Sequence, residues 1–326
     1  MPELTLVEAV RAALTRAMED DDRVLVMGED VGIDGGVFRA TDGLVQRFGS
    51  ARVRDTPLSE LLIAGMAVGV AAQGFRPVAE IQFMGFIYPT IDQIVNHAAR
   101  LRHRTRGRLS CPMVLRAPFG GGIHAPEHHS ESTEAMFAHM PGLRVVIPSS
   151  PQRAYGLLLA AIRDPDPVIF LEPKRIYRAT KQEVDDDGTA MALDDCFVLR
   201  EGRDITLVTW GAMVQEMLRA ADTLRDEGVV AEVIDVATLK PLDAATILGS
   251  IERTGRCVIV HEAALTAGFG AEIAARIAEK GLLSLLAPIE RVAGYDTVMP
   301  LLKLEDRYLP SETRILAAAR RALAFT

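Results

Sequence analysis

The feature that most constrains the fold is a repeated alternation of short apolar runs with longer segments of helical pattern. Short apolar runs are typical of strands buried on both faces, and the helical segments between them are long enough to cross back over a sheet. The candidate strands are 24–27, 77–83, 113–116, 144–147, 168–171, 205–210, 230–236, 257–261 and 289–292. The candidate helices are 58–73, 89–104, 151–163, 213–227, 243–253 and 269–280. This alternation predicts an α/β fold with mostly parallel sheets covered by helices on both faces.

A polar stretch interrupts the alternation between residues 173 and 204. It contains the acidic cluster Asp185, Asp186 and Asp187 followed by Gly188, which is typical of a linker. A chain of 326 residues is comfortable for two domains. We therefore expect one domain over residues 1–190, with the linker at its end, and a second over residues 191–326.

Composition narrows the classes of function. A net charge of −8 disfavours general binding of nucleic acid, which is itself a polyanion. No run reaches the roughly 18 uncharged apolar residues that a membrane span needs, and the first residues lack the pattern of a signal peptide. Cys111, Cys196 and Cys257 are widely separated and form no C-x-x-C pair, so they indicate reduced thiols. We expect a cytoplasmic protein that binds no membrane.

The segment 55–60, which reads DTPLSE, carries the first candidate for chemistry. It places a carboxylate in the first turn of a very apolar helix that begins near Pro57. Such an acid can simply compensate the positive end of the helix dipole. Alternatively, a carboxylate among apolar neighbours has a raised pKa and can share its proton with a nitrogen of a ligand. The segment alone favours compensation of the dipole, with the proton-sharing carboxylate as the alternative.

The segment 120–130, which reads GGGIHAPEHHS, carries the second candidate. Three glycines allow the backbone to approach a ligand closely. His124 and His128 are four residues apart, a spacing that on a helix would suit a zinc ion. Glycine and proline around them make a regular helix improbable, so a loop presenting a histidine for acid–base work is favoured over a metal site. A purely structural histidine remains the alternative.

Other motifs add little. The segment Gly268-Phe269-Gly270 lacks the third glycine of a dinucleotide loop, because Ile273 occupies that position, and it indicates a tight turn between a strand and a helix. The sequence contains no G-x-S-x-G, Walker loop or H-E-x-x-H.

The order and spacing of several short segments together resemble one family. These segments are MGEDVG at 27–32, GGVFRAT at 35–41, DTPLSE at 55–60, RPVAEIQF at 76–83, DQI at 92–94, HHS at 128–130, PGLRVV at 141–146 and DPVIFLEP at 166–173. The chain is similar to the beta subunit of the decarboxylating, thiamine-diphosphate-dependent component of 2-oxo acid dehydrogenase complexes. The resemblance implies a transketolase-like fold, with a pyrimidine-binding domain followed by a C-terminal domain used mainly for assembly.

The resemblance also implies roles for individual residues. Glu60 corresponds to the glutamate that activates the cofactor, and His129 to the histidine linked to acyl transfer. The remaining residues that it implies for the cofactor pocket are Leu58, Gln82 and Phe86. Phe86 lacks the hydroxyl that some relatives carry there, and Glu131 stands where many relatives have glutamine. A potassium site is implied near Ala161, Asp164 and Asp166, mostly through backbone oxygens.

The family's partners follow from the same resemblance. In the superfamily, a Gly-Asp-Gly segment followed by an asparagine holds the diphosphate and its metal ion. The nearest matches here begin at Asp34, Asp42 and Asp187, and none is preceded by the required glycine. We therefore expect an alpha subunit to supply magnesium and diphosphate binding in a complex of two alpha and two beta chains. A lipoyl-bearing acyltransferase core would accept the acyl group.

The substrate implied is a 2-oxo acid, and the segments around Phe86 and 119–124 favour pyruvate over branched-chain 2-oxo acids. An acetoin dehydrogenase beta subunit is a close alternative. A non-catalytic assembly subunit and a metal-dependent hydrolase built on the histidines of 124–129 are more remote.

Overall fold

The computed structural model describes residues 1–325, which divide into two compact units. Unit 1 comprises Met1–Phe119 and Met136–Leu193, and unit 2 comprises Gly120–Ala135 and the chain from Asp194 onward. The domain boundary near residue 190 stays a prediction, but the segment Gly120–Ala135 groups with unit 2, which the sequence did not suggest. No helix in the described part of the chain is long and apolar enough to cross a membrane.

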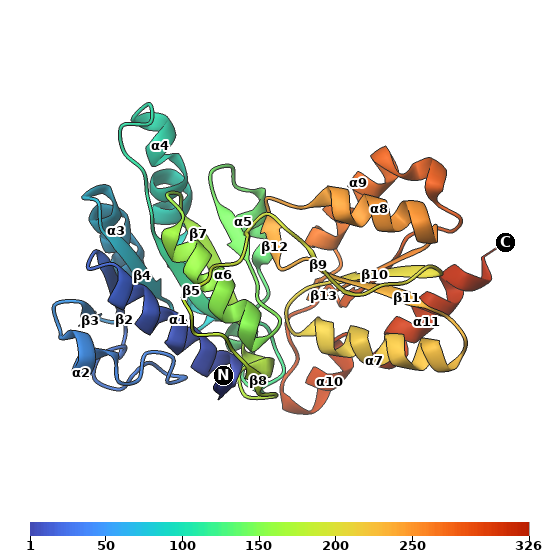
Figure 1. Cartoon of the computed structure of the whole chain (residues 1–326), viewed down its shortest axis with the longest axis horizontal. Helices are drawn as coiled ribbons and strands as arrows, with labels where there is room; N and C mark the ends of the chain where they lie inside the picture. The colour runs from blue at the N-terminus through green and yellow to red at the C-terminus, as the bar shows by residue number, and fades with distance from the viewer. Residues whose placement is uncertain (326) are drawn as a thin grey trace. The chain divides into compact units, whose positions relative to one another are not determined.

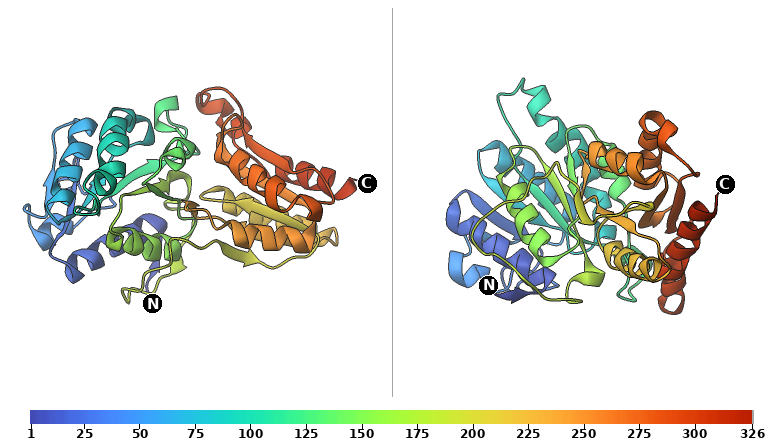
Figure 2. Two further views of the ribbon diagram at one scale, coloured as in Figure 1. Left: turned by 90° about the horizontal axis from the view of Figure 1, so that it is seen from above. Right: turned by 45° about the vertical axis from the view of Figure 1, so that its right-hand side comes forward.

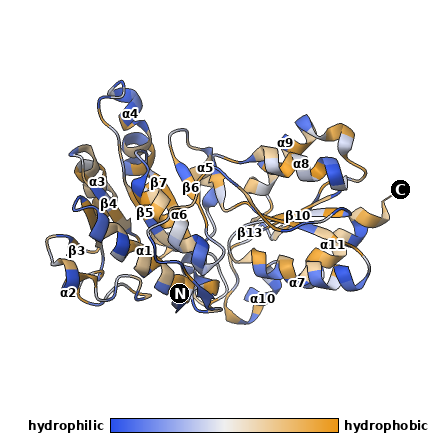
Figure 3. Cartoon of the chain, in the orientation of Figure 1, coloured by the Kyte–Doolittle hydropathy of each residue, from blue (hydrophilic) through white to orange (hydrophobic). Residues whose placement is uncertain are grey.

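Unit 1 is built on a parallel sheet with the strand order β6-β7-β5-β4-β2-β3. The strands are β2 (Val24–Gly28), β3 (Val53–Asp55), β4 (Arg76–Glu80), β5 (Val114–Phe119), β6 (Arg144–Val146) and β7 (Val168–Pro173). Every residue of β5 and β7 is buried, as expected for central strands covered on both faces, and Figure 3 shows orange hydrophobic residues in this part of the sheet. A short antiparallel pair joins β1 (Glu3–Leu4) to β8 (Gln182–Glu183).

Helices cover both faces of this sheet (Figure 2). The regular helices of unit 1 are α1 (Leu6–Asp20), α2 (Leu44–Phe48), α3 (Glu60–Ala72), α4 (Leu101–Arg104), the C-terminal part of α5 (Glu134–His139) and α6 (Pro151–Arg163). α1 packs against α6 on one face, and α3 packs with the segment 88–104 on the other. α1 begins at a capping box in which Thr5 and Glu8 satisfy each other's backbone amides. α6 has the bounds expected from sequence, with Ser150 as its cap and Pro151 at its first position.

Unit 2 has a second sheet with the strand order β14-β13-β10-β11-β9. Its strands are β9 (Phe197–Arg200), β10 (Ile205–Thr209), β11 (Ala231–Asp235), β13 (Cys257–Ala264) and β14 (Glu290–Gly294). The short strand β12 (Thr238–Lys240), also in unit 2, is not part of this sheet. Only β9, at the edge, pairs antiparallel. α8 (Ala244–Thr254) and α9 (Phe269–Lys280) lie on one face, and α7 (Met213–Asp226) and α11 (Glu312–Ala324) lie on the other (Figure 1). The predicted two-domain α/β fold with mostly parallel sheets is confirmed.

Two sequence expectations about helices are wrong. α3 begins at Glu60 after Ser59, not near Pro57, because the amide of Thr56 donates to the carbonyl of Gly28 and keeps the chain extended past β3. The segment expected as one helix over 89–104 is irregular: it joins 3-10 turns at Tyr88–Thr90 and Ala98–Arg100, a π-helical turn at Gln93–His97, and α4. Within it the Arg104 guanidinium donates to the carbonyl of Asn96, which competes with regular helical bonding.

A buried ion-pair network joins three neighbouring strands of unit 1. Arg116 on β5, only 1% exposed, donates to Glu80 on β4 and through Nε to Glu172 on β7 at 2.7 Å. The hydroxyl of Tyr177 donates to Glu172 at 2.6 Å. Burial raises the pKa of Glu80, whereas the charges of Glu172 and Glu80 overcome the burial of Arg116 and raise the pKa of its guanidinium.

Replacing Arg116 with methionine should destabilise the protein by about 3–5 kcal/mol, because two buried carboxylates lose their counter-charge. Arg116→Lys should fall between wild type and Arg116→Met. The matched control is Arg102→Met, which breaks an exposed pair with Asp166 and should cost less than about 1 kcal/mol. Urea unfolding followed by circular dichroism measures the differences. Equal losses for Arg102→Met and Arg116→Met would show that burial of the network is unimportant.

Candidate functional site

A pair of carboxylates forms the centre of the candidate site in unit 1. Glu60 is the first residue of the 13-residue helix α3, where the positive end of the helix dipole favours its charge. Glu29 follows directly after β2 and is 8% exposed, and its Oε1 atom is buried with no hydrogen-bond partner. Burial raises the pKa of Glu29, and the negative charges of Glu60, Asp30 and Glu80 raise it further. Of the pair Glu29 and Glu60, Glu29 is therefore the carboxyl group whose pKa is raised by burial.

The loop that carries Glu29 is held to β3 and β4. Both oxygens of Asp55 accept from this loop, from the amide of Gly32 at 2.6 Å and from that of Ile33 at 3.1 Å. Gly36 has φ +77°, and a Cβ atom there would come within 3.0 Å of Glu80 Oε1. A larger residue at 36 would press on the buried ion-pair network, so the glycine allows the loop to lie close to β4.

Gln82 and Phe86 reach the site from the chain that follows β4. The side chain of Gln82 donates to the carbonyl of Glu29 at 3.5 Å and to Asp30 Oδ2 at 3.3 Å. Phe86, half-buried at the end of the 3-10 turn Met84–Phe86, packs edge-on against Phe83 at 5.8 Å between ring centroids. The structure thus gathers Glu60, Gln82 and Phe86, with Leu58 adjoining Glu60 along the chain.

Several large apolar side chains in these segments are exposed on the single chain. Leu58 is 82% exposed, and Leu61 and Leu62 on the first turn of α3 are also exposed. Ile33 and Val37, on the loop that carries Glu29, are exposed as well. α3 is apolar on nearly all sides, which is typical of a helix that is buried completely. This surface can therefore bury more area against a ligand or another chain.

Glu29 is the residue of this cluster to which the sequence analysis assigned no role. The signal was present, because a carboxylate two residues beyond the predicted strand 24–27 lies at the carboxyl edge of a parallel sheet, where ligands bind in such folds.

His129 lies in unit 2, on the glycine-rich segment. It ends a short 3-10 turn, Glu127–His129, whose last amide donates to the carbonyl of Pro126 at 2.9 Å. Its half-buried ring packs on His128 at 4.3 Å between centroids. The expected loop is confirmed. His124 precedes the turn and His128 lies within it, so no regular helix brings the two side chains to one face. Within residues 1–325, no three His, Cys, Asp or Glu side chains are grouped so that they could hold a metal ion.

The far end of this segment is held by a buried acid. Glu134 is fully buried, and Trp210 Nε1 donates to its Oε1 at 3.4 Å. Burial raises the pKa of Glu134 to about 7, and the charge of Glu262 adds to this effect. Trp210 in turn stacks on His261, and burial lowers the pKa of that histidine to about 4.

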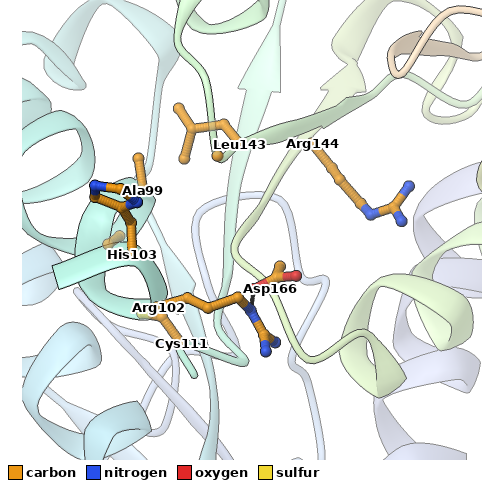
Figure 4. Close-up of a pocket in the computed structure, with 9 residues that line it drawn as sticks. Ala99, Arg102, His103, Cys111, Leu143, Arg144 and Asp166 are labelled. Carbon is orange, nitrogen blue, oxygen red and sulfur yellow. Dashed lines mark hydrogen bonds and ion pairs between the residues drawn. The ribbon is translucent and has the colours of Figure 1, made fainter. Parts of the chain in front are cut away.

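The residues expected at a potassium site form a separate turn at the end of α6. Asp166 pairs with Arg102 at 2.6 Å, beside a cavity of about 280 Å³ (Figure 4). The carboxylate of Asp164 pairs with Arg144 at 2.9 Å, and its carbonyl accepts from Arg76 at 3.1 Å. Ala161 contributes a carbonyl that accepts from the amide of Asp164 at 3.3 Å. Three arginines already supply positive charge here, so these donors suit an additional cation poorly, and the potassium site stays a prediction.

Comparisons with known proteins identify the two parts of the chain. The family described as "Transketolase, pyrimidine binding domain" matches residues 2–180, and "Transketolase, C-terminal domain" matches residues 195–315. A solved split-gene transketolase, described as an inactive beta4 tetramer, superposes with a TM-score of 0.82 over 99% of both chains at 23% identity. A transketolase from Pichia stipitis gives a TM-score of 0.73 at 13% identity, covering all of this chain and 46% of that one. These two structures support the fold alone.

Curated relatives match the whole chain more closely. The pyruvate dehydrogenase E1 component subunit beta of Bacillus subtilis is 48% identical over 325 residues, which is 100% of both chains. The corresponding subunits of Staphylococcus epidermidis and Staphylococcus aureus are 47% and 46% identical over the same length. Together with the two transketolase-type domains, this full-length similarity shows that the chain belongs to the family of beta subunits of the E1 component of 2-oxo acid dehydrogenases.

Proposed function

We propose that this chain is the beta subunit of a pyruvate dehydrogenase E1 component, in the cytoplasm, and that it binds the pyrimidine half of thiamine diphosphate at Glu60. The carrying observation is the placement of Glu60 at the start of α3 beside the buried Glu29. Pyruvate is favoured because the relatives at 46–48% identity carry that name. Branched-chain 2-oxo acid and acetoin dehydrogenase subunits are the alternatives.

The residues present fit a flat, partly polar heteroaromatic ring. A carboxyl group that shares a proton with a ring nitrogen is supplied by Glu60, and an aromatic face by Phe86. Gln82 is already oriented by its bonds to the loop of Glu29. The unpartnered Oε1 of Glu29 offers a further polar contact in a buried position.

Glu60 and Glu29 would divide the proton chemistry. Thiamine diphosphate, when bound, would supply a carbon nucleophile and an electron sink for decarboxylation of the 2-oxo acid. Glu60 holds a proton at the pyrimidine nitrogen, which tunes the basicity of the ring's amino group. Burial and the charge of Glu60 raise the pKa of Glu29, so Glu29 binds a proton more readily than an exposed carboxyl group does. His129 would hold or donate a proton at the sulfur of the lipoyl acceptor.

The other half of the cofactor must come from a partner. The chain lacks the Gly-Asp-Gly segment that its superfamily uses for diphosphate and magnesium. The exposed apolar side chains of α3 support a site completed by another chain. We propose that an alpha subunit supplies this half in a complex of two alpha and two beta chains, and that a lipoyl-bearing acyltransferase accepts the product.

Glu60→Gln should lower turnover of pyruvate by about 10²- to 10⁴-fold in the complex with the alpha subunit, because it removes only the shareable proton. The loss of turnover should be equal with an artificial electron acceptor and with a lipoyl domain. The rate of thiazolium hydrogen–deuterium exchange should fall in parallel. His129→Ala should instead impair lipoyl transfer more than the artificial reaction.

The exposed Glu183 provides a matched control, and Glu183→Gln should leave all three measurements unchanged. Wild-type thiazolium exchange in Glu60→Gln would refute the assignment of Glu60. A panel of pyruvate, branched-chain 2-oxo acids and acetoin identifies the substrate, and we expect pyruvate to give the highest kcat/KM.

The isolated chain should not bind thiamine diphosphate and magnesium measurably at concentrations that saturate the complex with the alpha subunit. The reason is that only the pyrimidine half would be contacted. Titration calorimetry on this chain, on the alpha subunit, and on both together makes the comparison. Tight binding and decarboxylation by the isolated chain would show that the site is complete without a partner.

Glu29→Gln should stabilise the protein at pH 8. Because the pKa of Glu29 is raised in the folded state, its ionised form costs stability above that pKa, and the cost disappears as pH falls toward the unfolded value of about 4.3. The advantage of the variant should therefore shrink with falling pH. Thermal midpoints of wild type and variant across pH 4–8 give the difference, in which the other titrating groups cancel. A difference that does not change with pH would contradict the raised pKa.

A further inference from the structure

A single carboxylate binds the first half of the glycine-rich segment in unit 2. Glu305 begins the short helix α10 (Glu305–Tyr308) and is only 1% exposed. One of its oxygens accepts from the amide of Gly122, and the other accepts from the amide of His124 at 2.8 Å. The second oxygen also lies 2.9 Å from Nδ1 of His124. A buried carboxylate thus meets three donors from one stretch of three residues.

The conformation of the segment depends on this contact. His124 has φ +57°, in the left-handed region that a non-glycine residue adopts only when its surroundings compensate for the strain. A Cβ atom on Gly121 would lie 2.7 Å from Cε of Met299 and 3.0 Å from Oε1 of Glu305. Glycine at 121 therefore lets the backbone approach the carboxylate, and Glu305 stabilises the unusual backbone at His124.

The same segment leads to His129 within five residues. Its base is closed by a hydrogen bond from the amide of Gly120 to the carbonyl of Glu131 at 2.9 Å. The amide of Ser130 donates to the carbonyl of Glu127, also at 2.9 Å, which completes the turn around His129. Hydrogen bonds therefore hold the chain on both sides of His129, at residues 120–124 before it and at residues 130–131 after it.

We propose that Glu305 is a positioning residue for acyl transfer: its carboxylate fixes the segment 120–124 and thereby sets the orientation of the His129 imidazole. This proposal rests on the proposed function of His129. Within residues 1–325, the hydrogen bonds and the ion pair of the Glu305 carboxylate go to Gly122 and His124, so it acts through His129 and not on the reacting atoms. A misplacement of a reacting group by about 1 Å can lower the rate about 100-fold. A more mobile segment would therefore lower the rate of acyl transfer.

The test uses the complex with the alpha subunit and the variant Glu305→Gln. Glutamine keeps one acceptor oxygen but turns an NH₂ group toward backbone donors. We expect the amides of Gly122 and His124 to exchange with deuterium on the order of tenfold faster. Transfer to a lipoyl domain should show kcat lowered by about 10- to 100-fold with KM unchanged. Decarboxylation with an artificial electron acceptor should fall by less than about threefold.

Three further variants sharpen the comparison. Asp306→Asn removes a charge from the exposed neighbour on the same helix and should resemble wild type in every measurement. Glu305→Asp keeps the charge on a shorter side chain and should recover part of the transfer rate. His124→Asn leaves both backbone bonds to Glu305 and should lose less than Glu305→Gln.

The outcomes separate the two proposals. Unchanged amide exchange in Glu305→Gln would overturn the anchoring role of Glu305. Faster exchange with equal losses in both assays, or with no loss, would overturn its role in positioning for transfer. Absence of lipoyl transfer in the wild-type complex would instead refute the proposed function, while the amide exchange would still report on the anchor.

Discussion

The ion-pair network of Arg116 with Glu80 and Glu172 is the interaction on which the functional end of unit 1 depends. It links the last residue of β4 and the next-to-last residue of β7 to the middle of β5, and each buried carboxylate would be costly without the shared guanidinium. Gln82 follows Glu80 by two residues, so the position of β4 determines where that side chain begins. The network therefore supports the part of the sheet edge that carries the candidate site.

The same network reaches the aromatic side of the site through a chain of ring contacts. Tyr177, bonded to Glu172, packs on Phe38 at 5.2 Å, Phe38 on Phe83 at 5.4 Å, and Phe83 on Phe86 at 5.8 Å. Edge-on packing of this kind restricts each ring. A continuous series of contacts thus runs from the buried ion pairs, through Tyr177, Phe38 and Phe83, to Phe86.

Charge is used differently around the two candidate groups. In unit 1, burial and the negative charge of Glu60 raise the pKa of the Glu29 carboxyl group. In unit 2, the buried Glu305 is satisfied by backbone amides and a histidine, so its charge stabilises a loop. In the proposed function, the first carboxylate cluster serves proton exchange with the cofactor, and the second carboxylate fixes the backbone of a loop.

The sequence by itself determined the fold class, most strands, the helix α6 to the residue, and the family, because periodic burial and short motifs are local properties of the chain. It also pointed to Glu60 and to the histidine loop, whose roles stay predictions. It did not predict α1 and α11, although Thr5 and Ser311 are residue types that commonly cap the start of a helix. Tertiary structure alone decided the start of α3, the irregular segment 88–104, the buried state of Glu29, and the partners of Arg116 and Glu305. The physical reason is distance along the chain: Arg116 meets acids 36 and 56 residues away, and Glu305 meets amides 183 and 181 residues away, so no spacing in the sequence records these contacts.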